Sequence, residues 1–464
     1  MLARLLPSIV LGVLLAITAF ALFGCGSNEY PEKPQVTGED EPNIILILTD
    51  DLDAQLLQDH LEAYPNLQKL AAEGITFENA FVTNPICCPS RATILRGQYS
   101  HNHGVLTNFP PRGGFERFKS LGREESTVAT WLHGGGYTTV LIGKYLNGKP
   151  RGHKPQGWDV FKGSGGAKTG TYPTDTYARN VSEYVRSMKG TRRPFFMYLA
   201  TKAPHAPAEP APRHSDAFPD AQDPHPPSFN EKDISDKPTW IKQMDLLGPK
   251  QIENNDEVYR NRLQSMLAVD EMIRRLVDSL EYSGKLENTY IFFTSDNGRT
   301  MGEHRRRAGK LSAYEEDIRV PLIVSGPGVP QGTVREHMVL NNDLAPTFAE
   351  LGGVSAPSFV DGHSIEPLLL PDPPSPSNWR SAFLVEGYGN KGESMPAYKA
   401  VRTTDHLWVE YATGERELYD LTEDPYELQS LHETAPDKLK RTLSSRLEEL
   451  RDCVRESCRS AEGF

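Results

Sequence analysis

The stretch "NIILILTDD", residues 43–51, decides the fold of this 464-residue chain. It is a short run of isoleucine and leucine that ends in two acids, Asp50 and Asp51. Such an uninterrupted apolar run predicts a strand that is buried on both faces of a parallel sheet, with the acids at its carboxyl end. Because open α/β sheets bind ligands at this edge, we expect the two acids to lie at a functional site.

Three further runs have a similar composition, at residues 194–201, 288–298 and 320–328. We expect these to be buried parallel strands as well. Residues 261–280 carry apolar side chains at helical spacing, which is typical of a helix that packs on a sheet. Strands that alternate with helices predict a doubly wound, mainly parallel α/β fold.

The C-terminal part has a different pattern. Residues 399–421 alternate between apolar and polar side chains with a turn at Gly414, which predicts short antiparallel strands. Residues 436–450 predict an amphipathic helix. The expected parts are a main domain over residues 43–370, a linker over 371–379 and a C-terminal subdomain with an antiparallel sheet over 380–464.

The chain carries a formal net charge of −12. This charge argues against a general nucleic-acid binder, so we expect no nucleic-acid partner. An anionic substrate would need a local cationic site to overcome the overall negative field.

Residues 1–25 have the pattern of a secretory signal, with Arg4, a long apolar run and a small residue before Cys25. The stretch "LFGC" resembles a bacterial lipoprotein cleavage box, which would leave Cys25 lipidated. An ordinary cleaved signal and an uncleaved anchor are the alternatives. The polar residues 26–42 suit a flexible tether. We expect an exported protein, tethered by lipid to the outside of the cytoplasmic membrane or cell envelope, or otherwise secreted.

The remaining four cysteines form two pairs along the sequence. Cys453 and Cys458 lie close together beyond the last predicted helix. In an exported protein this indicates a local disulfide, with two free thiols as the alternative. Cys87 and Cys88 are adjacent, and such a couplet rarely forms a disulfide and has too few ligands for zinc. Another use of sulfur has to be considered.

A second strand end carries polar groups. Asp296 and Asn297 follow an apolar run, as Asp50 and Asp51 do. Oxygen ligands of this kind suit a hard divalent cation, calcium or magnesium, better than zinc. An Asx-capped loop after the strand is the alternative for the second motif.

The residues "CCPSRATILRG" at 87–97 resemble the signature of the type I sulfatases, in which the first cysteine, here Cys87, is oxidised to formylglycine. The resemblance extends over almost the whole mature chain. It includes "TDD" (49–51), "GKYLNG" (143–148), "APHAP" (203–207), "SDNG" (295–298), "GKLSAYEEDIRVPLIVSGPG" (309–328) and "ELYDLTEDPYE" (417–427). The chain looks most like the branch of N-acetylglucosamine-6-sulfatases and extracellular heparan 6-O-endosulfatases. The resemblance implies an alkaline-phosphatase-like fold.

The resemblance also implies a covalent mechanism. The hydrated formylglycine aldehyde carries two hydroxyls; one attacks sulfur and expels the alcohol, and the other then releases sulfate and regenerates the aldehyde. A formylglycine-generating enzyme would act on Cys87 during maturation. One divalent cation, usually calcium in this family, would be held by the modified Cys87 together with Asp50, Asp51, Asp296 and Asn297.

Four further residues match functional positions of the family. Arg91, one helical turn after Cys87, would offer fixed positive charge to the hydroxyls; a solvated helix arginine is the alternative. Lys144 and Lys310 would bind sulfate oxygens. His205, in a proline-rich loop, would protonate the departing alcohol; a surface-loop histidine is the alternative.

The chain departs from the family at one position. Many members have a histidine two residues after the lysine that matches Lys144, where this chain has Leu146 followed by Asn147. That histidine is thought to help eject sulfate. His101 or His103 could take its place in the substrate site, or either could be a structural histidine.

His304 precedes a run of three arginines, residues 305–307. Such a run is usually a solvated face. The alternative is a surface that attracts polyanionic sugar.

These features favour an exported, calcium-dependent sulfatase that hydrolyses sulfate monoesters on a small molecule or, more specifically, a sulfated glycan. A phosphomonoester or phosphonate hydrolase of the same superfamily is the first alternative, although the sequence offers no second set of metal ligands for it. A non-catalytic lipoprotein that binds sulfated ligands is the second.

Overall fold

The computed structural model of the protein describes residues 41–163, 171–389 and 395–464. The predicted signal with Cys25, and all of the predicted tether except its last two residues, lie outside these ranges. Among the described residues, no helix is both long and apolar enough to cross a membrane.

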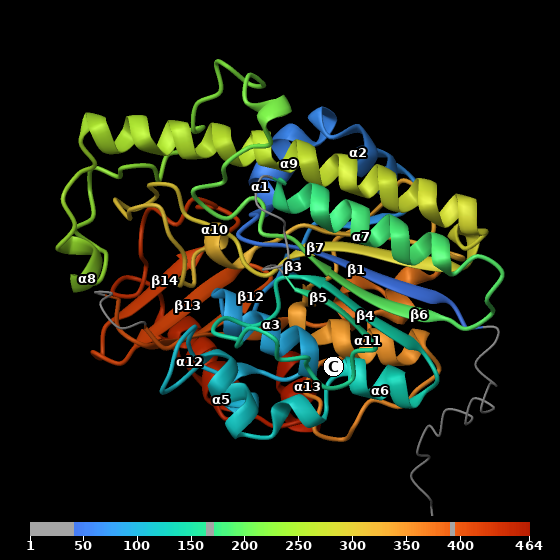
Figure 1. Ribbon diagram of the computed structural model, residues 1–464. Coiled ribbons are helices and arrows are strands. Elements are labelled where there is room, and N and C mark those ends of the chain that lie inside the picture. Colours follow the sequence, from blue (N-terminus) through green and yellow to red (C-terminus); the bar gives the residue numbers. More distant parts are fainter. Residues whose placement is uncertain (1–40, 164–170, 390–394) are drawn as a thin grey trace, which may run out of the picture. The chain divides into compact units, whose positions relative to one another are not determined.

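A large twisted sheet lies between two layers of helices (Figure 1). Its strands are β1 (Asn43–Thr49), β2 (Ile75–Phe77), β4 (Thr138–Gly143), β5 (Val160–Gly163), β6 (Phe195–Ala200), β7 (Thr289–Ser295), β8 (Leu322–Ser325) and β9 (Thr333–Arg335). They lie in the order β5-β4-β6-β1-β7-β8-β2-β9. Strand β1 pairs in parallel with both β6 and β7. The prediction of a mainly parallel α/β sheet is confirmed.

Helices cover both faces of this sheet. The helices of this part of the chain are α1 (Ala54–His60), α2 (Pro65–Ala72), α3 (Cys87–Arg96), α4 (Ser100–His103), α5 (Gly114–Ser120), α6 (Val128–Gly134), α7 (Pro173–Ser187), α8 (Thr239–Lys242), α9 (Pro249–Ser283), α10 (Glu315–Ile318) and α11 (Leu344–Leu351). Figure 1 shows α7 and α9 on one face of the sheet and α6 and α11 on the other.

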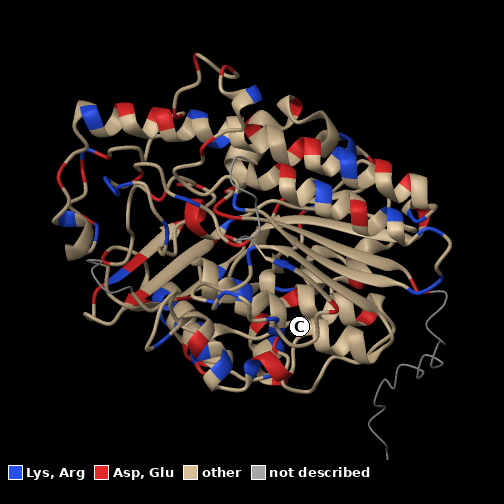
Figure 2. Cartoon of the chain, viewed as in Figure 1, with Lys and Arg blue, Asp and Glu red and all other residues tan. Residues whose placement is uncertain are grey.

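The side chains of β1 alternate between these two layers. Ile45 and Ile47 belong to the core that includes residues of α7 and α9. Ile44 and Leu46 belong to the core that includes residues of α6 and α11. Both faces of the strand are therefore buried in hydrophobic cores, which explains why residues 44–48 include no polar side chain. Figure 2 shows the complementary pattern, with charged residues along the outer sides of α7 and α9 and few on the central strands.

Two predicted elements differ in the structure. Strand β8, expected to be parallel, is antiparallel to both β7 and β2. An apolar run reports burial and carries no information on strand direction. Helix α9 begins at Pro249, well before the predicted apolar stripe at 261–280. Its first turns are polar and contribute little to the core, so the apolar pattern does not reveal them.

A separate four-stranded antiparallel sheet follows in the chain, in the order β11-β12-β13-β14. Its strands are β11 (Ala382–Gly387), β12 (Tyr398–Thr403), β13 (His406–Tyr411) and β14 (Arg416–Asp420). The helices α12 (Asp437–Arg451) and α13 (Glu456–Glu462) contribute Leu443, Leu447 and Cys458 to its core. The predicted antiparallel sheet is confirmed, and a disulfide joins Cys453 to Cys458. A short two-stranded sheet, β3 (Ala80–Phe81) with β10 (Val339–Leu340), completes the strands.

Candidate active site

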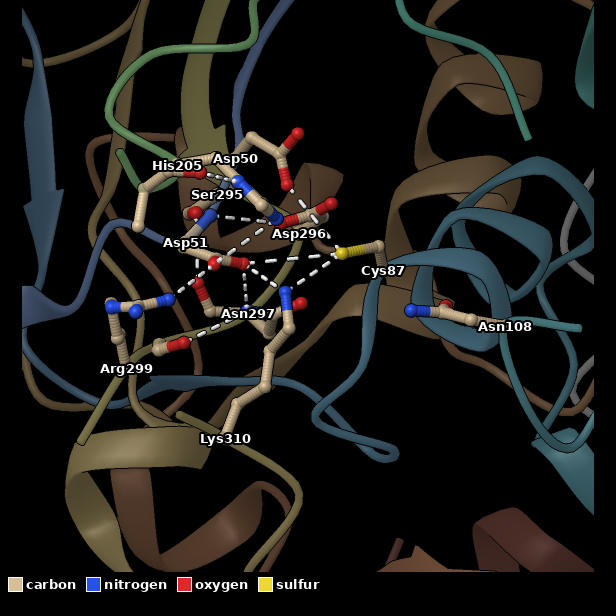
Figure 3. Close-up of polar contacts among 12 residues, drawn as sticks. Asp50, Asp51, Cys87, Asn108, His205, Ser295, Asp296, Asn297, Arg299 and Lys310 are labelled. Atoms are coloured by element: carbon tan, nitrogen blue, oxygen red, sulfur yellow. Dashed lines mark hydrogen bonds and ion pairs between the residues drawn. The ribbon is translucent and has the colours of Figure 1, made fainter. Parts of the chain in front are cut away.

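The carboxyl ends of β1 and β7 bring the strand-end acids together (Figure 3). The backbone N–H of Asp51 donates to Asp296 Oδ1 at 3.1 Å, and Asn297 Nδ2 donates to Asp51 Oδ1 at 2.8 Å. Asp50 lies next to them, and all four residues are buried. The parallel pairing of β1 with β7 is therefore what assembles this edge of the site.

Cys87 is the first residue of α3, and it faces the same acids. Its Sγ lies 3.5 Å from Asp50 Oδ1 and 3.9 Å from Asp51 Oδ1. The next backbone N–H, that of Cys88, donates to Asn108 Oδ1 at 2.8 Å, which satisfies one of the free donors at the start of the helix. Burial raises the pKa of the Cys87 thiol to about 12, so the unmodified side chain is protonated at neutral pH.

Lys144 reaches the site from the end of β4. Gly143, just before it, has a φ of 101°, and a Cβ there would lie 1.8 Å from the carbonyl oxygen of Ala200. This turn therefore requires glycine. It directs Lys144 Nζ to within 2.6 Å of Asp50 Oδ2.

Lys310 reaches the site from the loop between β7 and α10. Its Nζ lies 2.8 Å from Cys87 Sγ and pairs with an oxygen of Asp51. The residue is separated from Cys87 by more than two hundred positions in the chain, so only the tertiary fold brings the two together.

Arg91 lies one turn after Cys87 in α3 and is fully buried, so it is not a solvated arginine. Its Nε donates to Asp296 Oδ2 at 2.7 Å, and its Nη1 donates to the carbonyl oxygen of Lys144 at 3.0 Å. Its Nη2 lies 3.9 Å from Asp50 Oδ2. The guanidinium therefore contacts both Asp296 and Asp50 and holds their carboxylates in position.

The surrounding cations set the ionisation of the acids. Burial alone would raise the pKa of Asp50, but the charges of Lys144, Arg91 and Lys310 together outweigh burial and lower this pKa below its ordinary value. Burial also opposes ionisation of Asp51, where Lys310 again lowers the pKa. At Asp296 burial prevails and the pKa is raised.

His205 lies at the open side of the site, in the proline-rich loop, with 41% of its side chain exposed. Its Nδ1 lies 2.6 Å from the carbonyl oxygen of Ala206, to which it donates. Its Nε2 faces Asp51 Oδ2 at 3.7 Å (Figure 3). The backbone hydrogen bond therefore leaves Nε2 directed at the site.

Several of these groups could share a cation. Ligand atoms of Asp50, Asp51, Cys87 and His205 all lie within 4.8 Å of one another. Asn297 Oδ1 is buried and accepts no hydrogen bond from the residues that the structure describes. Because an orphaned oxygen and two carboxylates are hard ligands, this donor set fits a hard divalent cation.

His101 is not brought to this site. Its Nδ1 lies 3.1 Å from Glu386 Oε2, and its Nε2 lies 2.9 Å from the carbonyl oxygen of Cys453. Both ring nitrogens therefore connect α4 to the C-terminal part of the chain.

His103 is also engaged elsewhere. Its Nε2 lies 3.0 Å from Thr93 Oγ1, and its Nδ1 accepts a hydrogen bond from the N–H of Val105. Leu146, near the position where many family members have a histidine, lies in the hydrophobic core. Both histidines thus make structural contacts, which is the second of the two alternatives that the sequence leaves open.

Sequence reasoning missed three residues of the site. Arg299 Nη1 donates to Asp51 Oδ2 at 3.0 Å. Ser295 Oγ accepts from the N–H of Leu52 at 2.9 Å, and Asn108 holds the start of α3. Arg299 and Ser295 adjoin or belong to the "SDNG" motif, so their position could have indicated them. Asn108 has no comparable local signal.

Comparison with known proteins agrees with this geometry. The sulfatase family model matches residues 42–354, and that of the N-sulphoglucosamine sulphohydrolase C-terminal region matches residues 302–453. The chain is 32% identical over 489 residues to the N-acetylglucosamine-6-sulfatase of Homo sapiens, an alignment that covers 92% of this chain and 87% of the relative. It is 34% identical over 377 residues to the extracellular sulfatase SULF-1 homolog of Drosophila melanogaster, covering 76% of this chain and 34% of the relative.

Among solved structures, a protein in complex with its substrate D-glucosamine-2-N,6-O-disulfate has a TM-score of 0.76 and 28% sequence identity. The match covers 91% of this chain and 100% of that chain. The chain therefore belongs to the sulfatase family of sulfuric ester hydrolases and has the alkaline-phosphatase-like α/β fold that its sequence predicts.

Proposed function

We propose that the protein hydrolyses sulfate monoesters of a sulfated carbohydrate, using formylglycine derived from Cys87 and one bound calcium ion. The observation that carries this proposal is the convergence of Cys87 at the start of α3 with Lys310 and the strand-end acids. A buried thiol whose pKa is raised to about 12 is a poor nucleophile, which favours a role for the modified residue.

Formylglycine, once hydrated, supplies one hydroxyl that attacks sulfur and a second that expels sulfate and regenerates the aldehyde. The place of residue 87 at the helix start supports this use, because the N-terminal N–H groups and the helix dipole favour negative charge there.

Asp50, Asp51 and Asn297 would hold the calcium ion, together with the modified Cys87. The ion would supply fixed positive charge beside the sulfate group and the hydrated side chain. The orphaned Oδ1 of Asn297 supports its assignment as a ligand. Asp296 would be the remaining protein ligand. Its carboxylate also accepts hydrogen bonds from the backbone N–H of Asp51 and from Arg91 Nε, and so holds the acids and the buried arginine of α3 in place.

Lys144 and Lys310 would bind the sulfate oxygens as negative charge builds on them. Both ammonium groups already lie at the site. Lys144 Nζ is 2.6 Å from Asp50 Oδ2, and Lys310 Nζ is 2.8 Å from Cys87 Sγ. Preorganised charge of this kind stabilises a transition state without reorganisation at the moment of reaction. These lysines meet the need for a local cationic site in a chain whose net charge is −12.

His205 would protonate the departing alkoxide. The Nδ1–H bond to the neighbouring carbonyl fixes the ring, and Nε2 faces the site from its open side. A sugar alkoxide leaves poorly unless it is protonated, so an acid at this position is required for a carbohydrate substrate.

A 6-O-sulfated glucosamine derivative is the substrate that the relatives favour. One relative is named an N-acetylglucosamine-6-sulfatase, and the solved neighbour holds a glucosamine that carries sulfate at O6.

We also infer that the protein is exported and tethered through Cys25. The signal-like residues 1–25 and the disulfide between Cys453 and Cys458 support export, since disulfides persist mainly outside the cytoplasm.

The deciding experiment measures sulfate and phosphate release from matched aryl esters by the protein co-expressed with a formylglycine-generating enzyme. We expect sulfate release that is lost on calcium chelation and in Cys87→Ala, and retained in Cys88→Ala. Cys88 is the matched control because it is equally buried in the first turn of α3.

Mass spectrometry of the peptide containing Cys87 checks its conversion to the aldehyde independently. Dominant phosphate release would support the phosphoester hydrolase instead. Full sulfatase activity in Cys87→Ala would overturn the proposed nucleophile.

A further inference from the structure

A second group of metal-binding side chains lies outside the proposed catalytic machinery. Ligand atoms of His304, Glu316 and Glu427 all lie within 4.8 Å of one another. They come from three segments: the loop after β7, helix α10 and the stretch after β14. We call these three residues the His304 group.

The atoms that meet in this group lack hydrogen-bond partners. His304 is 0% exposed and Glu427 is 1% exposed, yet His304 Nε2 and Glu427 Oε1 make no hydrogen bond within the described ranges. The same holds for Glu316 Oε1, which has Arg306 Nη1 at 3.6 Å. Because a buried polar atom without a partner costs free energy, three such atoms on three residues whose ligand atoms lie within 4.8 Å of one another indicate a ligand between these residues.

We propose that the His304 group binds a divalent metal ion of the zinc type. One imidazole nitrogen and two carboxylate oxygens form a donor set that zinc accepts, with a further position open to water. A soft or purely oxygen-binding ion suits this mixed set less well.

The neighbours of the group are arranged as outer-shell partners of a metal ion usually are. His304 Nδ1 lies 2.7 Å from Glu231 Oε2, which fixes the ring with Nε2 as the free nitrogen. Glu427 Oε2 accepts the backbone N–H of Glu315 at 3.0 Å, which leaves Oε1 directed at the group.

The local charge also favours a cation. Glu316 and Glu427 line a cavity of about 560 Å³ whose walls carry seven carboxylates and four arginines. Arg306 is buried, so the prediction of a solvated face at 305–307 is wrong for this residue. Its closest carboxylate is that of Asp317, at 2.8 Å, and not one of the His304 group. Lys237 Nζ donates to the backbone carbonyl oxygen of Glu427, and its ion pairs within the described ranges are with Glu231 and Asp236.

Equilibrium dialysis of the purified full chain against Zn²⁺, with excess Ca²⁺ present, tests the proposal. An Asp51→Asn background removes zinc binding at the Cys87 site. We expect about one zinc ion per chain in this background. Zinc binding should fall at least tenfold in Glu427→Gln and in Glu316→Gln. It should be unchanged in Asp223→Asn, which alters another orphaned carboxylate of the same cavity.

Thermal unfolding separates loss of the site from loss of the fold. Zinc should raise the Tm of the Asp51→Asn protein and leave that of the Glu427→Gln double variant unchanged. Without metal, the double variant should be at least as stable, because it lacks a buried carboxylate without a partner. The proposal would be overturned if the Asp51→Asn protein bound no zinc, or if both glutamine variants bound zinc as tightly as the Asp51→Asn protein does, whatever the outcome for sulfatase activity.

Discussion

The two buried groups of acids in this molecule differ in how they are neutralised. At the Cys87 site, each of the three strand-end carboxylates has a lysine or arginine nitrogen within 3.0 Å. In the His304 group, Glu316 has an arginine nitrogen at 3.6 Å, and Glu427 forms no ion pair with any described residue. Four of the five carboxylates are buried and Glu316 is partly buried, but their charge is fully compensated only at the Cys87 site.

This difference indicates what each place can bind. A site that holds both acids and bases can take a cation and an anionic sulfate together, because each finds opposite charge. A group of acids with one neutral imidazole and little compensation suits a cation alone. The fold thus separates the proposed sulfate chemistry from the proposed second metal site.

The largest effect is expected when Cys87 is replaced by serine. A serine hydroxyl can attack sulfur but has no second hydroxyl to expel sulfate, so turnover should fall on the order of 10⁴-fold. Intact-protein mass spectrometry should show a sulfated protein after incubation with an aryl sulfate. The control variant Glu427→Gln should keep normal turnover and should not accumulate sulfated protein. Sustained turnover by Cys87→Ser would contradict the assignment of the nucleophile to residue 87.

Lys310→Ala should have the next largest effect. Its ammonium is proposed to bind the sulfate, so kcat should fall about 10²- to 10³-fold. Lys310→Arg should recover part of the rate because it retains the charge. Steady-state kinetics of both variants provide the measurement, with zinc binding at the His304 group as an unaffected control. A loss confined to KM would assign this lysine to substrate binding alone.

His205→Gln should show an effect that depends on the leaving group. Sugar alkoxides need protonation, so release of sulfate from a glucosamine 6-sulfate should slow about 10²-fold. A nitrophenyl sulfate has a good leaving group and should be hydrolysed at nearly the normal rate. Equal losses on the two substrates would indicate that His205 acts through the acids it faces, such as Asp51, and not as the acid.

Much of this site could be predicted from sequence because its residues lie at the ends of recognisable elements. Asp50 and Asp51 end an apolar run, and Asp296 ends a second one, so a parallel sheet must place them at one edge. Cys87 and Lys310 were found through motif resemblance, since their contact depends on loops whose paths have no local signal.

The histidines show where such reasoning fails. His101 and His103 lie in the chain just after α3, yet His101 contacts Glu386, which is distant in the sequence, and His103 contacts Thr93 within α3. Residue type and proximity in sequence do not reveal which partner a side chain will find. The run of arginines after His304 likewise predicts a solvated face, although His304 and Arg306 are both buried.

The smallest effect is expected for His101→Gln, and it should appear in stability instead of catalysis. Burial opposes the charged ring, but Glu386 outweighs it and raises the pKa of His101 above its ordinary value. A raised pKa in the folded state stabilises the protein most below about pH 6.5, the ordinary value, and this contribution is lost as pH rises through the folded pKa. The variant should therefore lose about 2 kcal/mol near pH 6 and less near pH 9, as measured by urea unfolding. A fall in kcat at unchanged stability would instead return His101 to the active site and remove the distinction between structural and catalytic histidines.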